Sequence, residues 1–167
     1  AAQIVIHMET DLRLPARPRD IQRVLLEHYR CDPGQLQVYG QDEWTAPPAS
    51  GSALARAMVV CPCTTGALAA IANGNSDNLL ERAADVTLKE GRKLILAVRE
   101  TPLSVIHLEN MLRLARAGAV ILPANPGFYY RPATVGELVN FIVARILDQL
   151  EIPHALLPRW GQDPEAR

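Results

Sequence analysis

The chain has 167 residues, of which 49% are apolar and 21% are charged, and its formal net charge at pH 7 is −1. This composition is typical of one globular domain and excludes a disordered chain, while the nearly balanced charge excludes a general attraction to nucleic acid or to an acidic membrane surface. No apolar run approaches the roughly 20 residues that a transmembrane helix needs, so we expect no membrane span.

The first residues, AAQIVIHMETD, lack an initiator Met and already carry apolar side chains in helical phase, at Ile4, Val5 and Met8. They predict a helix from residue 1 to about residue 10. Because no basic segment or cleavage signature accompanies them, we interpret them as a continuation of a longer chain and not as a signal peptide.

The segment up to residue 52 carries weaker signals. Pro15 and Pro18 interrupt any continuous helix, and three- and four-residue apolar spacing then predicts a helix over residues 19–28. A short strand is expected over residues 36–39. Residues 46–52, APPASGS, are too rich in Pro, Gly and Ser for regular structure, and we interpret them as a loop.

The pattern becomes regular at residue 57. AMVVCP, residues 57–62, is a continuous apolar strand of the kind found in parallel sheets that are covered on both faces. Thr64 or Thr65 can cap the following Ala-rich helix, which Gly74 ends. The free N–H groups at that helix start favour an anionic ligand, although a capped helix without a ligand is an equally good interpretation.

Strands and helices then alternate to the end of the chain. Gly91 ends a helix over residues 79–90, and residues 94–98 and 119–122 form buried strands. Between these strands, Thr101 and Pro102 are expected to start a helix that runs through residue 117. A capping box of Thr134 and Glu137 starts the last helix, which reaches residue 150. This alternation predicts an α/β fold with a parallel sheet and helices on both faces.

Charged side chains gather at the junctions of these elements. Arg99 and Glu100 directly follow an apolar strand, where an α/β sheet opens onto its ligand crevice. Glu100 suits a general acid or base there, and a structural Arg–Glu pair is an equal alternative. Arg82 and Lys89 lie seven apart, and therefore on one face of their helix.

Three further residues are ambiguous. Tyr129 lies in a stiff loop, PANPGFYYRP, where its hydroxyl can donate to a phosphate, whereas the neighbouring Phe128 is expected to fill the core. Arg145 lies inside the last helix, where it either extends to water or serves an anion. Glu9 is an isolated acid at the end of the first predicted helix.

The cysteines predict neither a disulfide framework nor a zinc site. Cys31, Cys61 and Cys63 are odd in number, and the Cys-Pro-Cys pair has no second pair and no nearby His. We therefore expect no metal and a reducing, cytoplasmic location.

Several of these stretches together resemble one family. CPCTTGALAAIANG, NLLERAADVTLKEGRKLILAVRETPLSVIHLENMLRLARAGAVILPANPGFYYRP and LPRW are similar to the UbiX/Pad1 family of flavin prenyltransferases, formerly described as aromatic-acid decarboxylases. The resemblance implies a Rossmann-like, flavodoxin-like three-layer sandwich in a single domain over residues 1–167, with a C-terminal tail from about residue 152. It also implies a homododecamer that binds FMN between subunits.

The activity that the resemblance implies is transfer of a dimethylallyl group from dimethylallyl monophosphate to N5 and C6 of reduced FMN. The product, prenylated FMN, is the cofactor of UbiD-type decarboxylases, which act in ubiquinone biosynthesis or in aromatic-acid breakdown. No metal is required, because a cationic cradle replaces the paired Asp motifs of most prenyl-diphosphate enzymes.

The resemblance also implies roles for individual residues. It assigns FMN binding to Thr64, Thr65, Gly66, Ala67 and Arg99, the donor phosphate to Tyr129 and Arg145 with Arg82 and Lys89 from a neighbouring subunit, and catalysis to Glu9, Glu100 and Trp160.

The chain departs from the family pattern at its start. The family's first strand, Gly-rich loop, helix and second strand are not in this sequence, so we expect a domain that is incomplete at its N-terminus. Two alternatives remain: an FMN-dependent decarboxylase of the phosphopantothenoylcysteine type, which reads Pro-Ala-Met-Asn where this chain has Pro-Ala-Asn-Pro, and a non-catalytic flavin-binding subunit.

Overall fold

The computed structural model describes residues 12–53 and 55–157, and it contains one parallel sheet with helices on both sides. The strands are β1 (Ala57–Cys63), β2 (Lys93–Val98) and β3 (Val120–Ile121), in the order β1-β2-β3. The predicted α/β fold with a parallel sheet is therefore confirmed.

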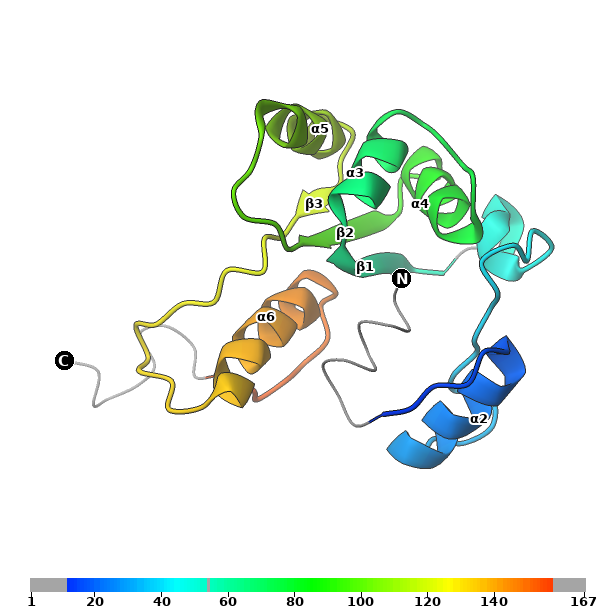
Figure 1. Ribbon diagram of the computed structural model, residues 1–167, viewed down its shortest axis with the longest axis horizontal. Coiled ribbons are helices and arrows are strands. Elements are labelled where there is room, and N and C mark those ends of the chain that lie inside the picture. The colour runs from blue at the N-terminus through cyan, green and yellow to red at the C-terminus, as the bar shows by residue number, and fades with distance from the viewer. Residues whose placement is uncertain (1–11, 54, 158–167) are drawn as a thin grey trace.

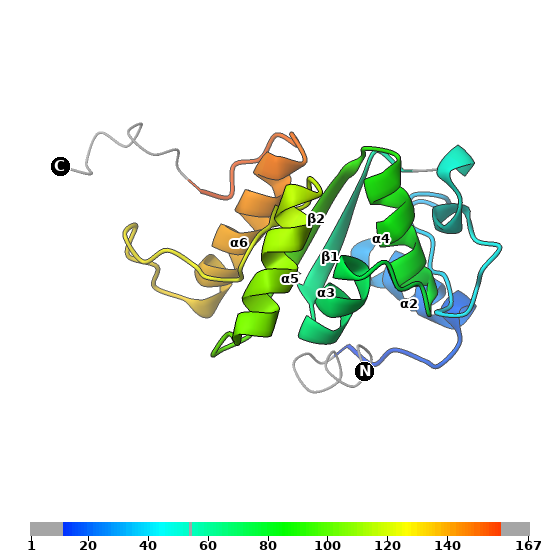
Figure 2. The same ribbon diagram turned by 90° about the horizontal axis from the view of Figure 1, so that it is seen from above.

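The described helices are α2 (Pro18–Tyr29), α3 (Thr65–Ala72), α4 (Leu79–Lys89), α5 (Val105–Arg116) and α6 (Val135–Gln149). Helix α2 lies apart from the sheet (Figure 1). Helices α3, α4 and α5 cover one face of the sheet, and α6 lies on the other side (Figure 1). Seen from above, α3, α4 and α5 lie in front of the strands, with α6 behind them (Figure 2).

The core lies between the sheet and its three-helix face. Leu94, Leu96 and Val98 alternate along β2 and pack in one cluster with residues of α3, α4 and α5. Ile95 and Ala97, whose side chains point to the opposite face of the sheet, are also buried. Because β2 is buried on both faces, its sequence is a continuous apolar run and not an alternation of apolar and polar residues.

The sequence predictions differ from the structure at two places in the N-terminal part: a strand was expected over residues 36–39, and no regular structure over residues 46–52. Residues 36–39 form no strand, because the N–H of Val38 donates to the side-chain oxygen of Gln22 on α2, at 3.1 Å, instead of to a strand. The expected loop 46–52 contains two short 3-10 turns, Pro47–Ala49 and Gly51–Ala53. The predicted first helix, residues 1–10, lies outside the described residues.

The start of α5 was also predicted wrongly. Thr101 and Pro102 are joined by a cis peptide bond and precede the helix, which Ser104 caps. The Ser104 hydroxyl accepts from the N–H of His107, and His107 Nδ1 accepts from the N–H of Ser104, both at 3.2 Å. This reciprocal pair satisfies two otherwise free donors and places the helix start at Val105.

The predicted cap of α6 is confirmed in part. The Thr134 hydroxyl accepts from the N–H of Glu137 at 3.2 Å, but the Glu137 carboxylate accepts from the N–H of Ala133 and not from that of Thr134. The carboxylate therefore fixes the residue before the cap.

The outer surface of α5 is unusually apolar. Val105, Ile106, Leu108 and Leu112 are 70%, 67%, 51% and 50% exposed. In the part of the chain that the structure describes, no helix combines the length and hydropathy required to cross a membrane.

Candidate functional site

The carboxyl ends of the strands meet at one edge of the sheet. Cys63 at the end of β1 is paired with Val98 at the end of β2. Beyond β3, the N–H of Ala124 donates to the carbonyl of Val98 at 2.8 Å. This edge therefore brings together the start of α3, the residues after β2 and the beginning of the loop over residues 123–134, as predicted for a ligand crevice.

The start of α3 leaves backbone donors available. Thr64 is the cap, and its hydroxyl accepts from the N–H of Ala67 at 3.2 Å. Among residues 12–53 and 55–157, nothing accepts a hydrogen bond from the N–H of Thr65 or of Gly66. Of the described residues, only Thr64 would lie near a Cβ built on Gly66, with its hydroxyl at 4.0 Å. The packing of these residues thus does not require glycine here, and the open space suits a ligand that approaches the helix start.

Arg99 and Glu100 lie at the same edge with exposed side chains. Glu100 accepts from the N–H of Thr101 at 3.2 Å. The guanidinium of Arg99 makes no hydrogen bond or ion pair with any residue of the two described ranges, so the Arg–Glu pair that was one interpretation of the sequence does not form in them. A cation next to free N–H groups is a combination suited to an anion or an electron-rich ring.

The aromatic residues of the loop pack against α6. Tyr130 stacks on Phe141 with its ring centroid 5.9 Å away, and its hydroxyl donates to the carbonyl of Glu137 at 3.1 Å. Partial desolvation, together with the Glu137 carboxylate, raises the pKa of Tyr130. Tyr129 is 62% exposed and meets both of these rings edge-on. Phe128 is 68% exposed, so the expectation that it fills the core was wrong.

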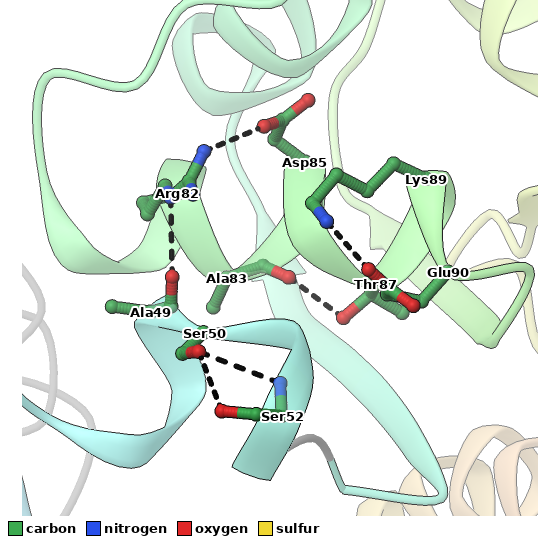
Figure 3. Close-up of polar contacts among 9 residues, drawn as sticks. All are labelled: Ala49, Ser50, Ser52, Arg82, Ala83, Asp85, Thr87, Lys89 and Glu90. Atoms are coloured by element: carbon green, nitrogen blue, oxygen red, sulfur yellow. Dashed lines mark hydrogen bonds and ion pairs between the residues drawn. The ribbon is translucent and has the colours of Figure 1, made fainter.

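Arg82 and Lys89 lie on α4, and both are already paired (Figure 3). Arg82 donates through Nε to the carbonyl of Ala49, at 3.2 Å, and through Nη1 to Asp85, at 3.1 Å. Lys89 pairs with Glu90, and this contact lowers the pKa of the Glu90 carboxyl. Arg82 therefore fastens the turn at residues 47–49 to α4 in addition to any role in binding.

Arg145 lies on α6, on the other side of the sheet from α4 (Figure 1). Its Nη1 donates to Asp148 at 2.7 Å, and the side chain is 51% exposed. Within one subunit, the cations assigned to the donor phosphate are therefore divided between two faces. A common site for Arg82, Lys89 and Arg145 requires more than one copy of the chain. Glu9 and Trp160 lie outside the described residues.

Sequence reasoning missed the carboxylates that hold the two arginines. Asp85 follows Arg82 by three residues, and Asp148 follows Arg145 by three residues. This spacing brings side chains together on a helix, so it is the signal that could have revealed both pairs. A further partner, His154, could not be found in this way, because it lies beyond the end of α6.

The cysteines are free thiols in different environments. Cys63 is buried, and this burial raises its pKa to about 11, whereas Cys61 is more exposed, and its partial desolvation also raises its pKa. In the described ranges, no group of three or more His, Cys, Asp or Glu side chains is arranged to hold a metal ion.

Known proteins share this architecture and sequence. A profile of the Flavoprotein family matches residues 1–147. Flavin prenyltransferase UbiX of Pseudomonas aeruginosa is 58% identical over 162 residues, which cover 97% of this chain and 78% of that protein. The crystal structure of AnUbiX (PadA1) in complex with FMN and dimethylallyl pyrophosphate superposes with a TM-score of 0.82 at 40% identity, covering 96% of this chain and 78% of that one.

A dodecameric FMN-dependent UbiX-like decarboxylase from Escherichia coli O157:H7 is similarly close. Its crystal structure superposes with a TM-score of 0.81 at 42% identity, covering 96% of this chain and 79% of that one.

Proposed function

This chain belongs to the Flavoprotein family, and from that premise we propose that it is a flavin prenyltransferase. In this reaction a dimethylallyl group passes from dimethylallyl monophosphate to reduced FMN. The relative that is 58% identical over nearly the whole chain bears this name, and a solved neighbour is in complex with FMN and dimethylallyl pyrophosphate. Within the chain, the observation that carries the proposal concerns one sheet edge, where the guanidinium of Arg99 and the first N–H groups of α3 have no hydrogen-bond partner among the described residues.

FMN fits the residues at this edge. The open space above Gly66 lets a planar ring or a phosphate approach the helix start, which the side chain of any other residue would partly fill. We assign FMN to Thr64, Thr65, Gly66, Ala67 and Arg99. Reduced FMN supplies the nucleophilic N5 and C6 atoms to which the dimethylallyl group becomes attached.

The residues assigned to the donor match the charge that develops on it. When the allylic C–O bond breaks, its electron pair leaves with the phosphate, so negative charge grows on the phosphate and positive charge on the allyl fragment. Arg145 and Tyr129, with Arg82 and Lys89 of a neighbouring copy, would stabilise the phosphate. Exposed aromatic rings such as Tyr129 can stabilise the allyl cation.

Carboxylates would manage the protons. Attachment at N5 would release a proton from N5, and attachment at C6 would add a proton to the double bond of the allyl group and release one from C6. Glu100, two residues after the end of β2, is our candidate for the carboxyl group that transfers these protons. We assign Glu9 to the same kind of role and Trp160 to the wall of the site, on the resemblance alone. No step in this scheme requires a metal.

The remaining parts of the proposal concern assembly and destination. A dodecamer is supported by the dodecameric neighbour, and a site shared between copies is supported by the position of α4 and α6, which carry the cations that we assign to the donor phosphate, on different sides of the sheet. We propose a UbiD-type decarboxylase as recipient of the prenylated FMN and a cytoplasmic location.

The proposal is tested by anaerobic incubation of the protein with FMN, dithionite and either dimethylallyl monophosphate or the pyrophosphate. A prenyltransferase yields a flavin heavier by one dimethylallyl unit in mass spectrometry, together with one equivalent of free phosphate or pyrophosphate. A decarboxylase of the phosphopantothenoylcysteine type releases carbon dioxide from its own substrate and leaves FMN unchanged. A non-catalytic subunit binds FMN and does neither, and either of these two results refutes the proposal.

A further inference from the structure

Asp148, near the C-terminal end of α6, uses both of its carboxylate oxygens. Oδ2 accepts from Arg145 Nη1 at 2.7 Å, and Oδ1 lies 3.0 Å from His154 Nε2. One carboxylate therefore joins a helical arginine to the segment that follows the helix.

The hydrogen bonds of His154 fix its tautomer. Its Nδ1 accepts from the N–H of Leu156 at 3.3 Å, so in the neutral ring the proton is on Nε2, which donates to Asp148. The ring is only 14% exposed, although the segment around it lies at the surface. His154 thus ties the chain beyond α6 to the carboxylate that holds Arg145.

The pairing leaves Arg145 prepared for an anion. A guanidinium binds phosphate best through two parallel N–H groups, and the side edge formed by Nε and Nη2 is one such fork. In Arg145, only Nη1 is engaged by the described residues, so this edge is available. In Arg82, Nε is already used by the carbonyl of Ala49. Of these two arginines, Arg145 is therefore the better bidentate partner for a phosphate.

We propose that Asp148 is a positioning residue for donor binding. It holds the guanidinium of Arg145 by Nη1, leaves the Nε/Nη2 edge for the phosphate of the prenyl donor, and makes that orientation depend on His154 and the segment after α6. This inference rests on the proposed function, in which Arg145 binds the donor phosphate. It adds a carboxylate and a histidine to which no role has been given.

The test compares Asp148→Asn with the parent protein in its FMN complex. Titration of dimethylallyl monophosphate into the oxidised complex, by calorimetry, measures donor binding without turnover. Loss of a charge-assisted hydrogen bond predicts a donor Kd, and a KM in the reductive assay, raised by about tenfold. The FMN affinity, kcat and Tm are expected to stay near those of the parent, and Asp148→Glu should restore most of the donor affinity.

A matched control and a double variant complete the design. Asp20 and Arg23 also form an ion pair between residues three apart on one helix, α2, with an N–O distance of 3.3 Å and the acid first in the chain. Asp20→Asn should leave donor binding unchanged. His154→Ala should also weaken the donor. Combined with Asp148→Asn it should add no further loss, because both act through one carboxylate.

Three results would overturn the inference. The first is an unchanged donor Kd in Asp148→Asn, and the second is losses that simply add in the double variant. The third is a fall in FMN affinity as large as that in donor affinity, since it would indicate general structural damage. If the parent protein binds the donor but does not prenylate FMN, the proposed activity is refuted. The donor Kd of Asp148→Asn then still decides separately whether Asp148 positions Arg145 for binding.

Discussion

Gly66 and Gly136 allow a paired test of where the flavin binds. Each is the second residue of its helix, two positions after a capping threonine, Thr64 for α3 and Thr134 for α6. Among the residues that the structure describes, a Cβ added at Gly66 would have only the Thr64 hydroxyl nearby, at 4.0 Å, and one added at Gly136 only the Thr134 hydroxyl, at 3.8 Å. For the protein alone, the two glycine-to-alanine changes are therefore almost equivalent.

Their expected effect on stability is small and favourable. Alanine loses less backbone entropy than glycine on folding and is the better helix former, by about 0.5–1 kcal/mol. For a chain of 167 residues, this gain corresponds to a rise in Tm of about 1–4 °C. We expect both Gly66→Ala and Gly136→Ala to melt slightly above the parent protein.

Their expected effects on the flavin differ. If the FMN occupies the open space at the start of α3, the new methyl group of Gly66→Ala meets it, and crowding of this kind costs about 1–3 kcal/mol. The FMN Kd should rise roughly 5- to 150-fold, while Gly136→Ala should bind FMN as the parent does. Flavin fluorescence titration measures both, with thermal melts of the apoproteins as the stability control. Unchanged FMN affinity in Gly66→Ala would show that the flavin does not approach this helix start.

Three further predictions concern other parts of the molecule. A Cβ on Gly127 would lie 2.6 Å from the ring of Tyr129 and 3.1 Å from that of Phe141. Gly127→Ala should therefore lower the free energy of unfolding by about 1–3 kcal/mol in denaturant titrations and raise the donor KM. Wild-type values for both quantities would contradict this packing. Glu100→Gln should lower kcat roughly 100-fold or more without changing the FMN Kd, as expected for loss of a general base; full turnover in rapid-mixing assays would remove Glu100 from catalysis. Burial raises the pKa of Cys63 from 9.0 to about 11, so the thiol of the unfolded chain ionises at a lower pH than that of the folded chain, and the free energy of unfolding should fall between these pH values. In urea unfolding, Cys63→Ala should lack this part of the pH dependence. Parallel pH profiles of the two proteins would contradict the prediction.

The central layers could be predicted from the sequence because local signals and burial agree there. The apolar run of β2 is buried on both faces, and Asn78, Thr64 and Thr134 each cap the helix that follows them. Thr64 and Arg99 each directly follow a strand of a parallel sheet, so both can be placed at one edge of the sheet before any side-chain contact is known.

The sequence was less informative where tertiary contacts decide. The backbone at Val38 is satisfied by the distant side chain of Gln22, which no local pattern reveals. Thr101 and Ser104 are both good caps, and the reciprocal bonds of Ser104 with His107 determine the choice. Phe128 reads as a core residue by type, yet it is exposed in the single subunit. For the cations assigned to the donor, only the family resemblance suggested a shared site, since no local pattern shows that α4 and α6 of different copies meet.

The apolar outer surface of α5 has a consequence for how this protein is handled. Val105, Ile106, Leu108 and Leu112 expose aliphatic side chains to water in the isolated subunit, and Val105, Leu108 and Leu112 share one face of the helix. If copies of the chain cover these side chains on one another, mass action links folding to association, and dilution lowers the melting temperature. Stability measurements on this protein should therefore be made over a series of subunit concentrations, with variants compared at the same one.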